Sequence, residues 1–228
     1  MAGKRSYDDG CAAAHALDLV GERWALLIVR ELVLGPKRFT DLRNGLPGIS
    51  PNVLTQRLEE LERASIVRRR RLPPPAASSV YELTPWGTEL EPAIQALGRW
   101  AARSPTMPIN LPLSVDALIL SLRTMFDSGA AAGVAGCVEL RLGEERFIAT
   151  IGDGDLTLVR RDAAAGDRAV DTTLESDTDT FVGVIYAGTR LADAVRSDRL
   201  RITGDKALAR RFVGLFTLPE RAPSENPT

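Results

Sequence analysis

Histidine and cysteine are scarce in this sequence of 228 residues, and their scarcity excludes several kinds of site. The only histidine is His15, which excludes multi-histidine metal sites and leaves a histidine-dependent triad with a single candidate. The two cysteines, Cys11 and Cys137, lie far apart and outside any CxxC pair, so neither a disulfide framework nor a structural zinc site is expected. We therefore expect no metal, no cofactor and a reducing, cytoplasmic location.

Long apolar runs are also missing from the sequence. The longest, residues 113–122 and 182–187, are far shorter than the roughly 20 residues that cross a bilayer. The first nine residues carry charge with no apolar segment after them, so they do not resemble a secretory signal. We expect a protein without a membrane span.

Three prolines in residues 104–112 interrupt an otherwise globular composition. They exclude a helix or a central strand there, and at roughly 100 to 200 residues per domain the length favours two domains. We place the domains at 1–104 and 113–218, with a linker at 105–112 and a flexible tail at 219–228. The first 104 residues hold 15 Lys and Arg against 12 Asp and Glu, and the remainder holds 14 against 18. This asymmetry indicates a polyanionic partner for the first domain alone.

Apolar residues recur at helical spacing in the first domain and predict helices over residues 12–20, 23–34 and 39–43. Ser50 as N-cap and Pro51 at the first helical position predict a fourth helix that ends near residue 64. A short helix, a tight turn and a second helix with Asn, Gln, Thr and Arg near its N-terminus suit a helix-turn-helix that enters the major groove. The alternative is a solvated amphipathic helix. Its core-facing stripe is Leu54, Leu58 and Leu61.

A run of four arginines, Arg68 to Arg71, follows this helix within a β-compatible segment at residues 66–71. Residues 72–79 are predicted to form a loop and residues 80–83 a returning strand, which together make a hairpin. Taken alone, the arginines favour a solvated edge strand. Beside the preceding helix they would lie next to the phosphate backbone of DNA, so we predict a winged helix-turn-helix.

Thr84 and Pro85 begin a further predicted helix that runs from Trp86 to about residue 102. Its apolar stripe runs at i, i+4, i+7 and i+11, with a second tryptophan beside it. We interpret the helix, packed with the first one, as a dimerisation element that spaces two reading helices for a two-fold operator. The alternative is packing within the chain. The candidate dimerisation residues are Leu90, Ile94, Leu97, Trp100 and Ala101.

Several ordered motifs in this half resemble the HxlR-type branch of the MarR-like regulators over about 90 residues. They are Cys11, ALDLVGERW at 16–24, REL at 30–32, GPKRFTDL at 35–42, PGISPNVLTQRLEEL at 47–61 and YELTPWG at 81–87. The resemblance implies a dimeric, sequence-specific transcription regulator whose partner is a double-stranded DNA operator. It implies base-reading residues Ser50, Asn52, Thr55, Gln56 and Arg57, and phosphate contacts by Lys37, Arg38, Arg68, Arg69, Arg70 and Arg71.

Some members of that family sense oxidants or electrophiles through a cysteine at the position of Cys11. The family usually places proline next, where this chain has Ala12. A reactive thiol needs a lowered pKa, and the nearby Asp8 and Asp9 would tend to raise it. His15, four residues on, is placed to stabilise a thiolate. The alternative is a small apolar residue packed at a dimer interface.

The second domain reads as a mixture of helices and strands, which makes the whole chain α+β. Its first helix, over residues 113–126, is apolar nearly all round and must be buried on several sides. We expect the strands to form an antiparallel meander that is covered by the helices at both ends. The expected strands are 136–142, 146–151, 156–160 and 169–174, with turns that include Gly166 and Asp167, and the later helices are 176–186, 191–195 and 205–216.

This half resembles the sterol carrier protein type-2 domain in three short motifs. They are LESD at 174–177, LRITGDKAL at 200–208 and FVGLF at 212–216, with a helix containing Phe181 between the first two. The resemblance implies an α/β domain with an apolar tunnel for a lipid-like molecule, although a closed core would use the same residues. The candidate lining residues are Leu118, Leu122, Met125, Phe126, Phe147, Phe181, Ile185, Phe212 and Phe216.

Three hypotheses for function follow from these observations. The leading one is a dimeric DNA-binding regulator whose second domain senses an apolar small molecule and so changes operator binding. The second keeps DNA binding, moves sensing to Cys11 and leaves the second domain as a structural platform. The third is a lipid-binding carrier. No carboxylate pair, nucleophile–base arrangement or phosphate-binding glycine loop supports catalysis, so we expect no enzyme.

Overall fold

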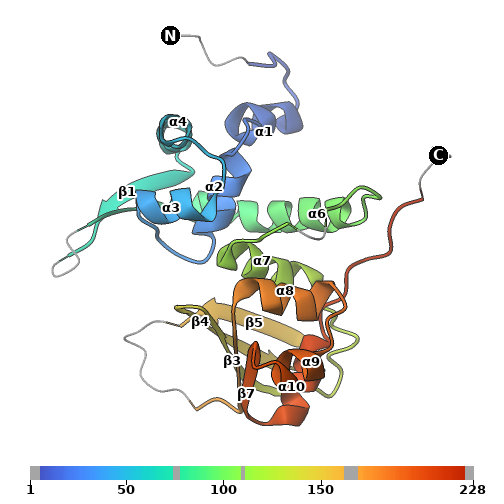
Figure 1. Ribbon diagram of the computed structural model, residues 1–228. Coiled ribbons are helices and arrows are strands. Elements are labelled where there is room, and N and C mark those ends of the chain that lie inside the picture. The colour runs from blue at the N-terminus through green and yellow to red at the C-terminus, as the bar shows by residue number, and fades with distance from the viewer. Residues whose placement is uncertain (1–5, 74–77, 109–110, 162–168, 224–228) are drawn as a thin grey trace. The chain divides into compact units, whose positions relative to one another are not determined.

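The structure is a computed structural model that describes residues 6–73, 78–108, 111–161 and 169–223. The chain divides into two compact units, Met1–Ile94 and Gln95–Thr228, which are described separately below (Figure 1). Both helices and strands are present, as the α+β prediction requires. Parts of the predicted hairpin loop, linker and tail, and the predicted turn at Gly166 and Asp167, lie outside the described residues.

The described part of the N-terminal unit consists of four helices, one hairpin, the short helix α5 and the start of α6. Strands β1 and β2 pair antiparallel, with Val67 opposite Leu83 and Arg71 opposite Ser79. A single bridge between Lys37 and Tyr81 attaches the hairpin to the segment before α3. The elements are α1 (Ala12–Val20), α2 (Ala25–Leu32), α3 (Phe39–Gly45), α4 (Pro51–Arg63), β1 (Val67–Arg71), β2 (Ser79–Leu83), α5 (Pro85–Thr88) and α6 (Leu90–Ala102).

The predicted helix over residues 86–102 is wrong in one respect, because it is divided into α5 and α6. Pro92 has no N–H to donate to the carbonyl of Thr88, so one helix cannot run through this position without losing a hydrogen bond. Thr84 caps the short α5 by accepting the N–H of Gly87 at 3.0 Å. The helix that follows is 13 residues long and crosses the boundary between the two units.

The core of the N-terminal unit gathers around α2 and α4. Leu54, Leu58 and Leu61 are each at most 1% exposed, which confirms the predicted stripe on α4. They join a cluster that includes Ile28 and Leu42, both fully buried. Since burying one leucine side chain contributes roughly 1.5–3 kcal/mol, this stripe fixes which face of α4 turns outward.

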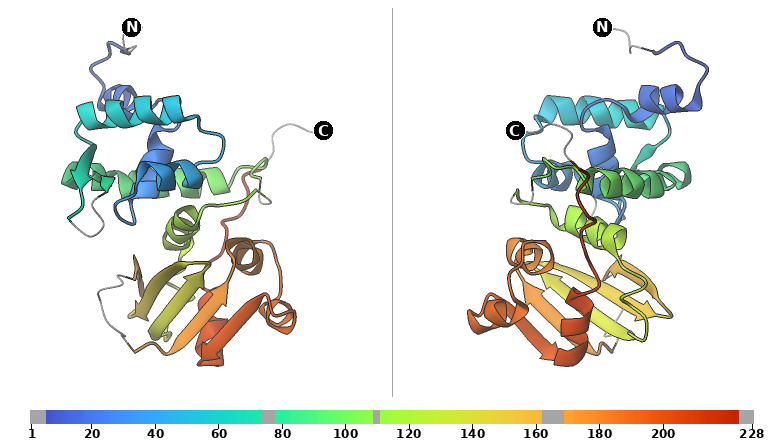
Figure 2. Two further views of the ribbon diagram at one scale, coloured as in Figure 1. Left: turned by 60° about the vertical axis from the view of Figure 1, so that its left-hand side comes forward. Right: turned by 90° about the vertical axis from the view of Figure 1, so that its right-hand side faces the viewer.

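The C-terminal unit holds five strands in the order β5-β4-β3-β6-β7, and they lie side by side in both views of Figure 2. Helix α7 packs against β5, α10 packs against β6 and β7, and α9 packs against β7. The elements are α7 (Val115–Met125), β3 (Gly136–Leu142), β4 (Glu145–Gly152), β5 (Asp155–Arg160), β6 (Thr172–Ser176), α8 (Thr178–Tyr186), α9 (Leu191–Arg196), β7 (Leu200–Gly204) and α10 (Lys206–Val213).

The predicted antiparallel meander is correct only for β3, β4 and β5. Strand β6 runs parallel to β3, with Leu140 beside Leu174, and β7 is a fifth strand that periodicity did not predict. The two-residue loops after β3 and β4 force the strands that they join to be antiparallel. The connection from β5 to β6 is longer, so the chain can reach the far side of β3 and pair in parallel there. The last helix also ends early, at Val213, after which Phe216 forms a bridge with Phe126.

Candidate DNA-binding surface

The predicted reading helix, α4, has a well-defined start that follows directly from its sequence. Ser50 Oγ accepts the N–H of Val53 at 3.3 Å, and Pro51 occupies the first helical position. Before it, Gly48 has a φ of +89°, a left-handed conformation that glycine adopts without a steric penalty, so the turn after α3 is tight. The cap uses the Ser50 hydroxyl as an acceptor, so this residue has a structural role on the same helix turn that was predicted to read bases.

Three of the predicted base-reading residues, Asn52, Thr55 and Gln56, are exposed on α4. Gln56 donates its amide to Glu60 Oε1 at 3.0 Å. Within the described part of the chain, the side chains of Asn52 and Thr55 have no hydrogen bond. Amide and hydroxyl groups of this kind are suited to pair with base edges in the major groove.

Arg57 lies differently from the other predicted base-reading residues. Its side chain is only 13% exposed, and Nη2 lies 2.8 Å from Glu22 Oε2 while Nη1 bonds Glu60. Its Nε donates to the carbonyl of Arg23 at 3.1 Å. Burial acts to raise the pKa of Glu60, but hydrogen bonds from Arg57 and Gln56 outweigh it and lower the pKa below the usual range. The Arg57 guanidinium is therefore engaged within the protein.

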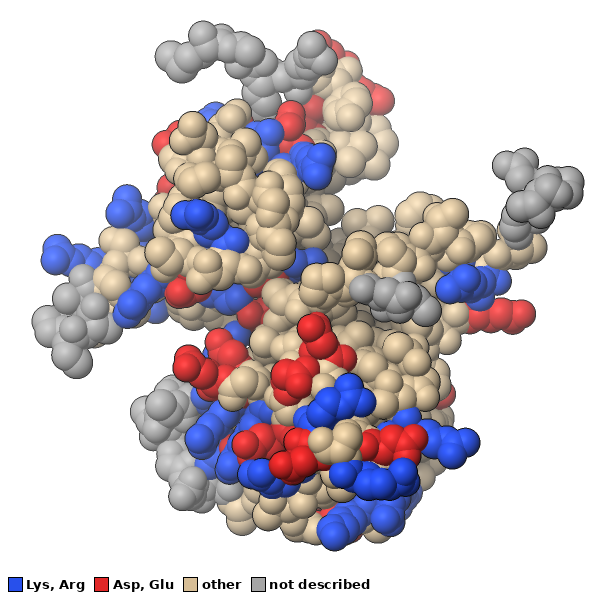
Figure 3. Space-filling model, viewed as in Figure 1, with Lys and Arg blue, Asp and Glu red and all other residues tan. Residues whose placement is uncertain are grey.

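The β1–β2 hairpin, called the wing below, carries the four arginines on one strand. Lys and Arg side chains gather over it at the left of Figure 3. Arg68 and Arg70 each donate Nε to Glu82, at 2.8 and 2.9 Å, yet remain 60% and 45% exposed. The Arg69 guanidinium lies 5.9 Å from the centre of the Tyr81 ring. These contacts fix the positions of the Arg68, Arg69 and Arg70 side chains. The wing still carries a net positive charge, because Glu82 is one acid against four arginines.

Lys37 and Arg38, the other predicted phosphate contacts, differ in their surroundings. Lys37 Nζ lies 2.8 Å from Glu31 Oε2, and the lysine side chain is only 15% exposed. Glu31 is fully buried, and the sequence already hinted at it, because a glutamate occupies a core-facing position of α2. Arg38 is exposed at the start of α3. Of the two side chains, Arg38 is the more exposed.

The predicted dimerisation stripe separates into two parts. Leu90 and Ile94 pack against the core of the N-terminal unit, which agrees with the alternative prediction of packing within the chain. Leu97 and Trp100 are 50% and 76% exposed, and Ala101 is partly buried. An exposed tryptophan and leucine one turn apart leave an apolar strip on the last two turns of α6.

Cys11 is the N-cap residue of α1 and is exposed. Hydrogen bonds from the backbone N–H groups of Ala13 and Ala14 lower the pKa of its thiol. The net shift is therefore opposite to the one expected from Asp8 and Asp9, because the backbone N–H groups at the start of α1 lower the pKa. Asp9 instead accepts the backbone N–H of Cys11 at 2.9 Å.

Most of the predicted tunnel-lining residues of the C-terminal unit are closed core. The rings of Phe212 and Phe216 are 5.1 Å apart, and Ile185 is partly buried. The residues that are at most 2% exposed are Leu118, Leu122, Phe147, Phe181, Phe212 and Phe216.

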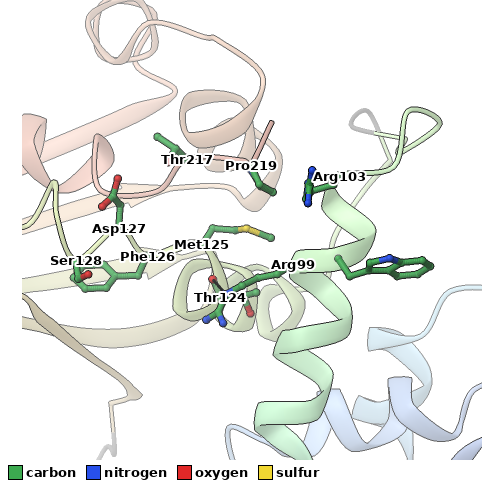
Figure 4. Close-up of a pocket in the computed structure, with 10 residues that line it drawn as sticks. Arg99, Arg103, Thr124, Met125, Phe126, Asp127, Ser128, Thr217 and Pro219 are labelled. Carbon is green, nitrogen blue, oxygen red and sulfur yellow. Dashed lines mark hydrogen bonds between the residues drawn. The ribbon is translucent and has the colours of Figure 1, made fainter. Parts of the chain in front are cut away.

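Met125 and Phe126 do reach a hollow in the C-terminal unit. Its volume is about 620 Å³, and Figure 4 shows it lined also by Arg99, Arg103 and Pro219. Arg99 Nε donates to the carbonyl of Thr124 at 2.8 Å, which holds the guanidinium at the rim. Apolar side chains and fixed guanidinium groups therefore share one open space.

Two further features concern the part of the chain that the structure describes. No helix there is long and apolar enough to cross a membrane. No three side chains of His, Cys, Asp or Glu lie together there as a set of metal ligands.

Two family models match this chain. A model described as HxlR-like helix-turn-helix matches residues 19–107, and one described as alkyl sulfatase C-terminal matches residues 106–222. The second match gives the family of the C-terminal half as the alkyl sulfatase C-terminal domain. The resemblance to the sterol carrier protein type-2 domain is not confirmed by it and stays a prediction. The short motifs that suggested the latter are mostly structural, so they do not distinguish one family from another.

Similar proteins agree with the first match. The HTH-type transcriptional regulator YodB of Bacillus subtilis (strain 168) is 42% identical over 86 residues, which cover 38% of this chain and 77% of YodB. The solved reduced form of YodB is 38% identical and covers 42% of this chain and 95% of that one, with a TM-score of 0.39. A quinone-bound form of YodB has also been solved.

A solved structure is similar to the C-terminal half as well. The stereoselective inverting sec-alkylsulfatase Pisa1 from Pseudomonas sp. is 18% identical, with a TM-score of 0.41. The match covers 49% of this chain and only 17% of the alkylsulfatase. The N-terminal relatives are transcriptional regulators and not enzymes, and this short C-terminal match carries no activity over to the chain.

Proposed function

The chain belongs to the HxlR-like helix-turn-helix family of DNA-binding regulators, and we propose that it binds its operator as a dimer, through α4 and the wing. The observation that supports this most is the outward face of α4. Its start is fixed by Ser50 and Pro51, its inner face is anchored by leucines, and Asn52, Thr55 and Gln56 remain exposed. A rigid helix with exposed polar groups near its N-terminus is what major-groove reading requires.

The two parts of this surface divide the work of binding. Amides and hydroxyls on α4 supply sequence discrimination, at roughly 1–3 kcal/mol for each good bidentate contact with a base. The wing arginines and Arg38 supply affinity for phosphates, which does not depend on sequence and falls as salt rises. The exposed strip of Leu97 and Trp100 is our candidate for pairing two subunits.

Fluorescence anisotropy on the DNA upstream of the protein's own gene tests this function. At about 150 mM salt we expect tight binding to that DNA, weaker binding to a scrambled duplex, and a steep loss of affinity as salt rises. Equal affinity for both duplexes over a range of salt would contradict sequence-specific reading.

Sensing by the C-terminal unit is the first candidate for regulation. The hollow beside Met125 and Phe126 is supported as an effector site by its apolar floor and its fixed Arg99. An effector changes operator binding only if it prefers one arrangement of the protein over another. A Met125→Glu variant of the full chain should lose the response to apolar effectors while operator binding without effector stays unchanged. A response identical to the wild type would remove the hollow from the mechanism.

Thiol sensing is the second candidate, and it is supported by the exposed position and lowered pKa of Cys11. The relative YodB has a solved quinone-bound form, which adds weight to an electrophile as the signal. Treatment with a quinone should release the wild type from DNA and leave Cys11→Ser bound. Cys137→Ser is the matched control and should respond as the wild type does. Release of Cys11→Ser by the same treatment would exclude the thiol.

A further inference from the structure

The corner between α1 and α2 has an unusual backbone conformation. Trp24 has a φ of +80° and a ψ of −19°, in the left-handed region that bulky side chains rarely adopt. Such a conformation persists only when its surroundings hold it in place. The Arg23 guanidinium lies 5.2 Å from the centre of the Trp24 ring, but this contact joins neighbouring residues and does not fix the corner to the rest of the unit.

Trp24 also packs against the core of the unit, and the polar contacts that hold the corner come from α4. Arg57, in the middle of α4, reaches Glu22 with Nη2 at 2.8 Å and the carbonyl of Arg23 with Nε at 3.1 Å. Its Nη1 returns to Glu60, one turn further along α4. We call this set the arginine clamp: Arg57, Glu22, Glu60 and the Arg23 carbonyl.

The geometry of the clamp leaves Arg57 little freedom to reach DNA. All three of its nitrogens donate within the protein, and its side chain is 13% exposed. A rotation outward would leave Glu22 and Glu60 without their shared cation and break the bond to the Arg23 carbonyl. Bonds between a guanidinium and carboxylates are among the stronger polar contacts in proteins, and they are directional. The clamp therefore fixes the angle of α4 as well as its distance from the corner.

We propose that Arg57 is a positioning residue for DNA reading: it locks α4 to the α1–α2 corner and contributes to operator binding without contacting DNA. The proposal rests on the DNA-binding function above for its binding readout. Asn52 and Gln56 must meet base edges within a few tenths of an ångström, so a small rotation of α4 weakens operator binding selectively. Wing contacts to phosphate depend much less on that angle.

A single substitution separates positioning from direct contact. Glu22→Ala removes a negative charge, so on electrostatic grounds alone it would strengthen DNA binding. If the clamp positions α4, Glu22→Ala instead weakens operator binding several-fold, and Arg57→Ala weakens it about tenfold. The double variant should be no weaker than Arg57→Ala, because both changes remove the same interaction. Glu59→Ala is the matched control, since Glu59 is an exposed acid on α4, the helix that carries Arg57. This variant should bind the operator as tightly as the wild type or more tightly.

The salt dependence of binding gives a second readout. The slope of log K against log salt is negative, and loss of a phosphate contact makes it less steep by about 0.9. Loss of a positioning residue leaves the slope unchanged. An unchanged slope with Arg57→Ala, together with full affinity for a scrambled duplex, excludes a phosphate contact. Weaker operator binding by Glu22→Ala than by Glu59→Ala then excludes a base contact, because Glu22→Ala leaves the Arg57 side chain in place. A reduced slope, with Glu22→Ala binding as tightly as Glu59→Ala, would overturn the proposal and make Arg57 a DNA contact.

Amide hydrogen exchange tests the clamp without DNA, so that its failure is distinguishable from failure of the proposed function. Exchange should accelerate at residues 22–26 and in the first turn of α4 in both Glu22→Ala and Arg57→Ala, and stay unchanged in β3 and β4. If the wild type shows no operator preference but exchange still accelerates in this way, the DNA function fails and the clamp remains. Exchange equal to the wild type in both variants would overturn the clamp itself.

Discussion

On the wing, Arg68 and Arg70 share one carboxylate, that of Glu82, whereas Arg141, Arg160 and Arg161 of the C-terminal unit each meet an acid that is itself buried. Glu139 is 1% exposed and bonds both Arg141 and Arg161, and Arg160 bonds the buried Asp116. In the first region positive charge is left over for a partner, and in the second it is consumed by the fold. A count of charged residues does not distinguish these cases, but the position of the acids does.

The largest effect that sharpens this comparison concerns the C-terminal core. Phe212→Ala should destabilise the protein by about 3–5 kcal/mol, because the ring is fully buried and its loss leaves a cavity. Urea unfolding followed by near-UV circular dichroism measures it. The control is Val159→Ala at a half-exposed position of β5, which should cost less than about 0.5 kcal/mol. A cost below about 1 kcal/mol for Phe212→Ala would indicate an open pocket in place of a closed core.

Removal of wing arginines should have the next largest effect, on DNA binding and not on folding. The double variant Arg69→Ala/Arg71→Ala should make the negative slope of log K against log salt less steep by about 1.8, since each lost phosphate contact contributes about 0.9. Anisotropy titrations at several salt concentrations measure the slope. Arg210→Ala, at an exposed position of α10, is the control and should leave the slope unchanged. An unchanged slope for the wing variant would show that the wing does not meet phosphates.

Loss of the α4 cap should have a smaller effect. Ser50→Ala should cost about 1 kcal/mol of stability, because the N–H of Val53 loses its side-chain acceptor. Ser50→Asp keeps an acceptor at the same position and should retain most of that stability. Equal stability of Ser50→Ala and the wild type in urea titrations would show that the cap does not fix the start of the helix.

The smallest expected effect is on the pH dependence of stability. Burial acts to raise the pKa of Glu82, but hydrogen bonds from Arg70 and Arg68 outweigh it and lower the pKa. The ion pairs therefore stabilise the fold above the usual glutamate pKa of about 4.3 and are lost as pH falls through the lower folded value. Because both arginines are largely exposed, the contribution should stay below about 1 kcal/mol. Glu82→Gln should flatten this part of the profile, and an identical profile would contradict the assignment.

The local parts of the fold could be predicted from the sequence. Ser50, Pro51 and the leucine stripe determine where α4 begins and which face it buries, because caps and helical periodicity act over a few residues. The arginine run predicted the wing for the same reason. The break before α6 was equally local, and Pro92 was the signal for it.

Long-range features could not be predicted in the same way. The parallel pairing of β3 with β6 joins strands separated by two others, and periodicity within a strand carries no information about its neighbour. The family resemblance implied that Arg57 reads bases, and its partner Glu22 lies 35 residues earlier in the chain, so no local pattern showed the ion pair. Phe126 and Phe147 were equally apolar candidates for a ligand site, yet only Phe126 reaches the hollow.

Substitution of the outward residues of α4 tests the central claim most directly. Asn52→Ala and Gln56→Ala should each weaken binding to the operator about tenfold at about 150 mM salt and leave affinity for a scrambled duplex unchanged, because the lost contacts are to bases. Equal loss on both duplexes, or no loss on either, would contradict the account that α4 reads the operator.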